Sequence, residues 1–156
     1  MKHIISVMVE NKFGVLARIA NLFSARGFNI DSLAVGETED PAVSRMTIVV
    51  RGDDKILEQV KKQLNKVINV ISVNDYLNKE HIDRELILFK VNINKETKDK
   101  AVKILDKANA DIIKVSDDAI TVEIVGDQDK ISALFKALEG LDISEIVRTG
   151  RIAMAL

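Results

Sequence analysis

The sequence has little of several residue types on which common functions depend. It contains no cysteine and no tryptophan, and aromatic residues make up only 4% of its 156 residues. The absence of cysteine excludes a disulfide framework, a thiolate metal site and a cysteine nucleophile. The formal net charge is −1, so no overall electric field draws the chain toward nucleic acid or anionic lipid.

Long hydrophobic runs are also absent. The apolar run near the N-terminus is interrupted by Glu10, too early for a signal peptide, and no stretch reaches the length of a membrane span. Apolar residues make up 47% of the chain and charged residues 30%, which is the mixture of a soluble globular protein. We therefore expect a cytoplasmic protein with one domain or two small ones.

Catalytic motifs are missing as well. His3 and His81 lie far apart in the sequence, and we expect both at the surface or in turns. The chain has no glycine-rich phosphate loop and no G-x-S-x-G motif. The acidic pairs Asp53-Asp54 and Asp117-Asp118 fall at predicted turns, where capping and solvation account for them. No nucleophile or acid/base pair can be named, so the pattern favours a non-catalytic protein, with a catalytic protein as the alternative.

Residues 4–36 form the most informative stretch. An apolar strand over 4–9 is followed by a polar turn, a helix that opens at Gly14, and a second strand that starts at Asn29-Ile30. The first amides of a helix attract anions, and a glycine there lets a ligand approach the backbone. With Val15 and Leu16 beside it, this turn suits the carboxylate of an aliphatic amino acid. An ordinary strand-to-helix turn is the alternative, and the spacing alone favours it.

Both halves of the chain show the same order of elements, βαββαβ. Two similar segments, 52–56 and 126–131, open the second helix of each half, and we align them with one inserted residue. Thr97 is the expected N-cap of the helix between them. A short polar link over 78–83 separates the expected domains, 1–77 and 83–156. The first-half strands are expected over 3–10, 30–37, 44–51 and 67–77, and the second-half strands over 85–94, 111–116, 119–125 and 141–154, the last as one strand or two.

Two nucleic-acid-binding alternatives are weak. A βαββαβ sheet that binds RNA needs exposed aromatic residues and a basic surface. Four of the five phenylalanines lie in or beside predicted helices, and the chain is slightly acidic. No helix-turn-helix segment remains once both halves are assigned, which argues against a transcription regulator.

Several motifs resemble one known family almost from end to end. In the first half they are Val9-Glu10-Asn11, residues 14–18 and 22–33, then 44–49 and 57–64; in the second half they are residues 83–86 and 145–151. These segments are similar to the regulatory small subunits of acetolactate synthase, also called acetohydroxyacid synthase. The first half of such a subunit is an ACT domain, a small module that senses amino acids.

The resemblance implies an α+β fold with two tandem ferredoxin-like βαββαβ domains, of which the first is the ACT domain. It implies a chain without an active site, bound to a large catalytic subunit that carries thiamine diphosphate, magnesium and FAD. The small subunit raises the activity of its partner and confers inhibition by valine, sometimes by leucine or isoleucine. An ACT-domain sensor that regulates a different metabolic enzyme is the alternative.

The same resemblance implies an effector site between two ACT domains of a homodimer. The backbone amides of Gly14, Val15 and Leu16 would hold the effector carboxylate. The side chains of Asn11 and Asn29 would meet its ammonium or carboxylate group, and an amide offers both a donor and an acceptor. Ile30 and Val35 would line the apolar pocket. Core packing is the alternative for the apolar residues, and a turn role is the alternative for Asn29.

Arg148 and Arg151 lie in the last of the matching segments. The resemblance implies a structural or interface role for them.

Overall fold

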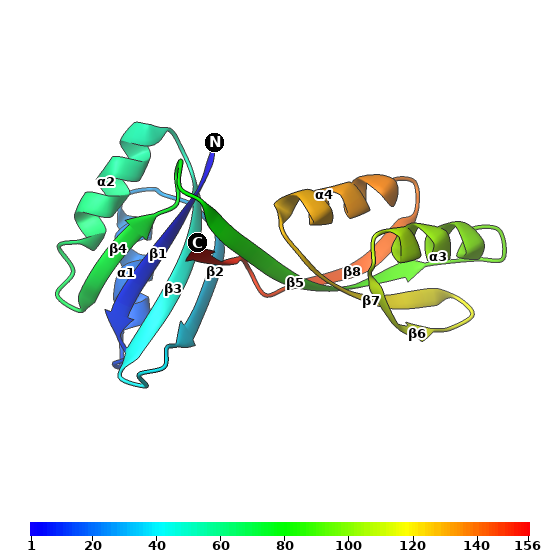
Figure 1. The fold of residues 1–156 in the computed structure, drawn as a ribbon, viewed down its shortest axis with the longest axis horizontal. Helices are drawn as coiled ribbons and strands as arrows, with labels where there is room; N and C mark the ends of the chain where they lie inside the picture. The colour runs from blue at the N-terminus through cyan, green and yellow to red at the C-terminus, as the bar shows by residue number, and fades with distance from the viewer. The chain divides into compact units, whose positions relative to one another are not determined.

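A computed structural model describes residues 1–156. The chain forms two compact units, one of Met1–Ile82 with Arg151–Leu156 and one of Asp83–Gly150. The first unit contains β1 (Lys2–Glu10), α1 (Val15–Ala25), β2 (Ile30–Glu37), β3 (Val43–Arg51), α2 (Asp54–Leu64), β4 (Val70–Asp75) and, from the end of the chain, β9 (Ile152–Ala155) (Figure 1). The second contains most of β5 (His81–Asn92), then α3 (Lys98–Lys107), β6 (Asp111–Val115), β7 (Ala119–Gly126), α4 (Gln128–Ala137) and β8 (Asp142–Arg148).

Both units share one sheet topology. The strand order is β2-β3-β1-β4 in the first unit and β6-β7-β5-β8 in the second, with antiparallel pairing throughout these paths. Each order places the first strand of a half at the centre and the second and fourth strands at the edges. The predicted α+β fold with two tandem ferredoxin-like βαββαβ domains is therefore confirmed.

The C-terminal segment packs with the first unit. The second domain is expected over 83–156, and the last part of that range, Arg151–Leu156, lies in the first unit. There β9 pairs with the start of β5, and two further hydrogen bonds attach the ends of the segment. The Arg151 backbone N–H donates to Ser32 Oγ at 2.8 Å, and the Leu156 N–H donates to the Glu80 carbonyl at 3.2 Å.

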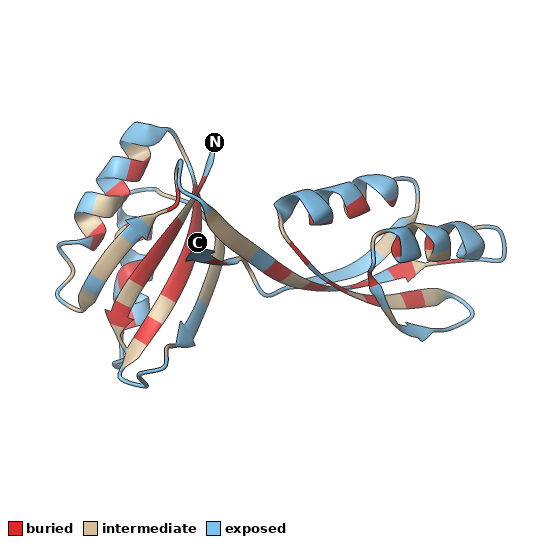
Figure 2. Cartoon of the chain, viewed as in Figure 1, coloured by how far each residue is buried: buried red, intermediate tan, exposed pale blue.

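The core of the first unit follows from alternation along its central strands. Every second residue of β1 points to the helices, and Ile5, Val7 and Val9 are buried there. The inner faces of α1 and α2 supply the other side of the same cluster, so both helices cover one face of the sheet (Figure 2). His3 was expected at the surface but is buried in β1, where its Nε2 lies 3.0 Å from the Gly52 carbonyl oxygen. The helix residues of this core are Val15, Ile19 and Phe23 from α1 and Leu57, Val60 and Leu64 from α2.

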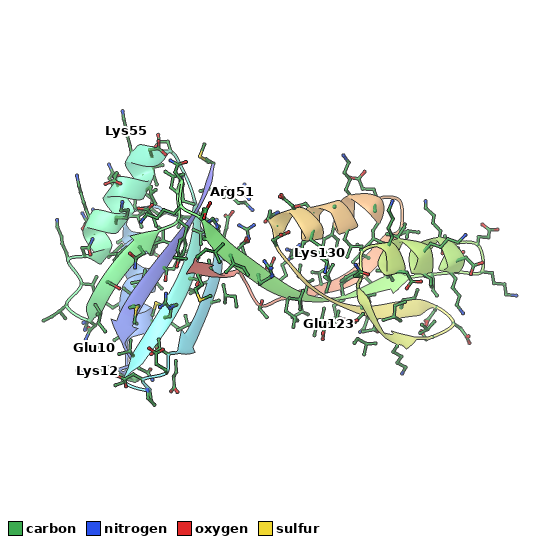
Figure 3. The ribbon with its side chains drawn as sticks, viewed as in Figure 1. Glu10, Lys12, Arg51, Lys55, Glu123 and Lys130 are labelled. Atoms are coloured by element: carbon green, nitrogen blue, oxygen red, sulfur yellow. The ribbon has the colours of Figure 1, made fainter.

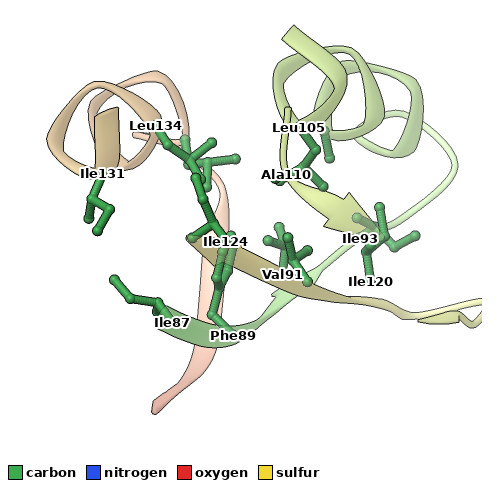
Figure 4. Close-up of a cluster of buried hydrophobic side chains, with 13 residues drawn as sticks. Ile87, Phe89, Val91, Ile93, Leu105, Ala110, Ile120, Ile124, Ile131 and Leu134 are labelled. Atoms are coloured by element: carbon green, nitrogen blue, oxygen red, sulfur yellow. The ribbon is translucent and has the colours of Figure 1, made fainter. Parts of the chain in front are cut away.

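The second unit has an equivalent core. Ile87, Phe89 and Val91 of β5 point toward the two helices that cover the sheet, and they meet Leu105 of α3 and Leu134 of α4 (Figure 4). Each fully buried leucine or isoleucine contributes roughly 1.5–3 kcal/mol relative to an exposed one. The unit therefore has a hydrophobic core of its own.

The second helices of the two halves start in the same way. Asp53 accepts a hydrogen bond from the Ile56 N–H at 2.9 Å, and Asp127 accepts one from the Lys130 N–H at 2.8 Å. Asp53 and Asp127 are therefore equivalent N-caps, as is typical of aspartate at this position. This pairing makes Lys130 the counterpart of Ile56, so the inserted residue expected from the sequence is wrong and the two segments align without a gap.

The start of α3 differs from the prediction. Thr97 directly precedes the helix, but its side chain caps no helical amide and its backbone is already helical. Asn94 holds the turn just before the helix, where its Oδ1 accepts hydrogen bonds from the Glu96 and Thr97 N–H groups, each at 2.9 Å. Thr97 Oγ1 closes the turn by accepting from the Asn94 N–H at 2.9 Å.

Candidate functional site

The turn between β1 and α1 has the geometry of an open helix start. Gly14 occupies the N-cap with a left-handed φ of 81°, a conformation that favours glycine. A methyl group placed on Gly14 would meet no atom within 4 Å. The Val15 N–H donates to the Lys12 carbonyl at 3.3 Å, whereas the backbone bonds of this turn leave the amides of Gly14, Leu16 and Ala17 without an acceptor. Those three amides and the helix dipole favour an anion here.

The apolar residues of this turn divide into a buried and an exposed group. The Val15 side chain is only 3% exposed and belongs to the core. Leu16 is 45% exposed, and Phe13 is fully exposed directly before Gly14. Sequence reasoning missed Phe13, although an aromatic residue in a polar turn is a signal in itself. The open turn therefore has an apolar rim made by Phe13 and Leu16.

Asn11 is held with its acceptor oxygen outward. Its Nδ2 donates to the Pro41 carbonyl at 2.9 Å and to Glu37 Oε1 at 3.2 Å. Both N–H groups of the amide are thereby used, and Oδ1 is left to accept a hydrogen bond. Glu37 is the last residue of β2, so this contact joins the open turn to one end of that strand.

Asn29 is held in the same manner at the other end of β2. It follows α1 after Gly27, whose φ of 69° ends the helix. Its Nδ2 donates to Asp31 Oδ1 at 3.2 Å, and Asp31 Oδ2 accepts from Arg51 Nε at 2.7 Å. The hydrogen bond from Arg51 holds the pKa of Asp31 below its ordinary value, so the carboxylate is ionised in neutral solution.

The two asparagines stand too far apart to contact one amino acid from a single chain. Asn11 precedes α1 and Asn29 follows it, and a helix of 11 residues spans about 16 Å. They also flank the two ends of β2, which is an edge strand of the sheet. Val35 is 44% exposed on this strand, whereas Ile30 packs against the core. The structure thus brings the predicted residues into two groups, Asn11 with Gly14–Leu16 and Asn29 with Ile30, with Val35 on the strand between them.

A network of polar contacts surrounds the open turn. Glu10 ends β1 and accepts a hydrogen bond from Asn69 Nδ2 at 2.7 Å, and Lys12 Nζ lies 3.2 Å from its carboxylate. The bond from Asn69 and the nearby Lys12 keep the pKa of Glu10 below its ordinary value. Figure 3 labels Glu10 and Lys12 at this end of β1. The Glu10 carboxylate is therefore bound to Asn69 and Lys12 and does not occupy the start of α1, which stays accessible to another anion.

Comparisons with known proteins identify the family of this chain. Residues 5–72 match the family described as "AHAS small subunit-like ACT domain", and residues 84–156 match "Small subunit of acetolactate synthase". The chain is 49% identical over 154 residues to the probable acetolactate synthase small subunit of Archaeoglobus fulgidus, covering 99% of this chain and 96% of that protein. The chain belongs to the acetolactate synthase small-subunit family.

Other members of the acetolactate synthase small-subunit family support the assignment. The small subunit of Aquifex aeolicus is 45% identical over 98% of this chain and 80% of that protein. The crystal structure of the Thermotoga maritima small subunit superposes with a TM-score of 0.87, at 39% identity, covering 100% of this chain and 98% of that one. The predicted ACT domain is thus confirmed, and it carries every residue of the candidate site. None of the helices is long and apolar enough to cross a membrane.

Proposed function

We propose that this protein is the cytoplasmic regulatory subunit of an acetolactate synthase in branched-chain amino acid biosynthesis. It binds a large catalytic subunit, raises its activity and makes it sensitive to feedback inhibition by valine, with leucine or isoleucine as further effectors. Thiamine diphosphate, magnesium and FAD are cofactors of that catalytic subunit and are not held by this chain. The relatives of this chain are small subunits of acetolactate synthase, which supports a subunit role.

One observation carries the effector part of this proposal. The two asparagine groups sit at opposite ends of the edge strand β2, so each chain holds two halves of an amino-acid site that cannot meet. If the β2 strands of two copies pair antiparallel, the Ile30 end of one lies beside the Glu37 end of the other. Asn29 of one copy then approaches the open turn at Gly14 of the other, and two complete sites form in a homodimer.

The polarity of the completed site matches a free amino acid. The amides of Gly14, Leu16 and Ala17 would receive the carboxylate. The outward oxygens of Asn11 and Asn29 would accept from the ammonium group, because the nitrogen of each amide already donates to a carboxylate. Leu16 and Val35 would contact an aliphatic side chain. Threonine should bind less well than valine, since an apolar pocket leaves its hydroxyl group without a partner.

A ligand that bridges two copies can act as an allosteric effector. It stabilises the dimer arrangement in which both halves of the site fit it, and it shifts the equilibrium only by its difference in affinity between arrangements. Allosteric couplings typically amount to about 1–3 kcal/mol. A coupling free energy of this size is enough for an effector bound between two ACT domains to change the activity of a catalytic subunit several-fold.

Reconstitution tests the proposal. Purified chain is mixed with an acetolactate synthase large subunit, and acetolactate formation from pyruvate is measured with and without valine, leucine, isoleucine and threonine. We expect no activity from the chain alone, a rise when it joins the large subunit, and inhibition by valine only when both are present. Activity of the chain alone would contradict the regulatory role. Amino-acid binding without any effect on the large subunit would favour a sensor for a different enzyme.

A further inference from the structure

Asp31 occupies an irregular position at the start of β2. Ile30 pairs with Val50 and Ser32 pairs with Val49, so the ladder has a bulge in which Asp31 is the extra residue. A bulge turns a side chain away from the direction that regular pairing would give it. Here it aims the Asp31 carboxylate along the end of the sheet, where its side chain is only 11% exposed.

Three groups hold this carboxylate. Arg51 Nε donates to Oδ2 at 2.7 Å, and Lys2 Nζ lies 3.5 Å from the same oxygen. Arg51 and Lys2 face each other across β3 and β1, at the end of the sheet where Figure 3 labels Arg51. The other oxygen, Oδ1, accepts from Asn29 Nδ2 at 3.2 Å. Each carboxylate oxygen therefore has its own role: one is fixed by cations, and the other receives the asparagine amide.

This arrangement determines which atom Asn29 presents. An amide group can rotate by half a turn and exchange its donor for its acceptor. The ionised carboxylate accepts only from the amide nitrogen, so the carbonyl oxygen of Asn29 must point away from Asp31. Asp31 also offsets one of the two positive charges of Lys2 and Arg51, which reduces their repulsion of an ammonium group nearby.

We propose that Asp31, held in place by Arg51, is the positioning residue that makes the effector site specific for an α-ammonium group. The inference rests on the proposed function, since it concerns the same amino-acid site. Asp31 does not touch the ligand in this proposal; it orients Asn29 and balances the local charge. The site then distinguishes a free amino acid from the carboxylic acid with the same carbon skeleton.

A merely structural role for Asp31 predicts a different result. If the residue only fastened β2 to β3, its loss would weaken every ligand to the same degree or none at all. A role in ammonium recognition predicts a selective effect. Valine and isovalerate separate the two, because isovalerate has the same branched skeleton and carboxylate but no amino group.

The test is calorimetric titration of the full-length chain with valine and with isovalerate, with and without an acetolactate synthase large subunit. We expect wild type to prefer valine. In Asp31→Asn, valine should bind roughly tenfold more weakly, which corresponds to losing one hydrogen bond to a charged group. Isovalerate should bind as well as before or better, because the positive charges of Lys2 and Arg51 then have no carboxylate beside them and attract an anion. The preference for valine should therefore collapse.

Asp75→Asn is the matched control. Asp75 makes a similar contact, with Lys61 Nζ at 2.6 Å, but it lies on β4 at the opposite edge of the same sheet. This variant should keep the wild-type preference for valine over isovalerate. A cooperative thermal unfolding transition in both variants shows that each is folded.

The other possible outcomes contradict the proposed role of Asp31, the proposed function, or both. An Asp31→Asn variant that keeps the wild-type preference, or that loses both ligands equally, overturns the positioning role while the proposed function stands. A wild type that binds no amino acid in either setting overturns both. If Asp31→Asn does not fold, Arg51→Gln replaces it: with Asp31 no longer held, the preference for valine should fall, and an unchanged preference rejects the inference.

Discussion

Replacing Gly14 by aspartate is the most direct test of the effector site. The side chain would enter open space, because a methyl group on Gly14 meets no atom within 4 Å. The left-handed φ of 81° is unfavourable for most residues but is tolerated by aspartate and asparagine. The new carboxylate would lie beside the free amides of Leu16 and Ala17, where the effector carboxylate is expected.

The size of the effect follows from Coulomb's law. Two carboxylates about 5 Å apart repel by about 3 kcal/mol at an effective dielectric constant of 20 and by under 1 kcal/mol in bulk water. The turn is exposed, so the true value lies between these limits, and affinity should fall by roughly five- to a hundredfold. The left-handed backbone adds a cost of up to about 1–2 kcal/mol to folding.

Gly14→Asn is the matched control, since asparagine has the same shape and a similar backbone preference but no charge. Valine affinity of both variants is measured by calorimetry, and activation of the large subunit is measured alongside. We expect weaker valine binding by Gly14→Asp than by Gly14→Asn, with activation retained in both. Equal valine affinities for the two variants would refute the placement of the effector carboxylate at this turn.

Three further predictions concern stability. Asp53→Ala and Asp127→Ala should each lower the free energy of unfolding by about 1 kcal/mol in urea titrations, because each removes an equivalent N-cap. Ser32→Ala removes the acceptor of the Arg151 N–H, so hydrogen exchange at that amide should accelerate, while unchanged exchange would contradict the contact. The pKa of Asp31 is lowered from 3.8, so its stabilisation is present above that pH and is lost as the pH falls through the folded-state pKa. Thermal melts of wild type should therefore decline more steeply than those of Asp31→Asn as the pH falls below about 4.

Local signals account for the parts of the fold that the sequence predicted. Asp53 and Asp127 follow glycine and precede helical periodicity, and a cap needs only its own chain neighbours. The strand order of both sheets follows from the βαββαβ order once each half folds as one unit. Thr97 stands at the start of α3 as predicted, but its hydroxyl oxygen accepts from the Asn94 N–H and caps no helical amide. That choice depends on the dihedral angles of the turn rather than on residue types.

Cross-strand contacts account for what the sequence did not reveal. Asp31 and Glu37 orient the two asparagines, but their roles depend on which strands lie side by side and on a bulge in β2. His3 is buried because β1 is central in its sheet, a fact that its own neighbours in the sequence do not determine. The amide of Val15 is taken by the Lys12 carbonyl, which depends on the backbone of the turn.

The position of the C-terminal segment could not be predicted from the repeated βαββαβ order of elements. Two tandem βαββαβ halves suggest that the second half ends where its last strand ends, yet Arg151–Leu156 returns to the first unit. The hydrophobic pattern of the segment does not show where it packs, because only Ala153 is buried in β9. Residues 83–150 are consequently joined to the ACT domain at both ends. One of the two attachments is the hydrogen bond from the Arg151 N–H to Ser32, the neighbour of Asp31 on β2.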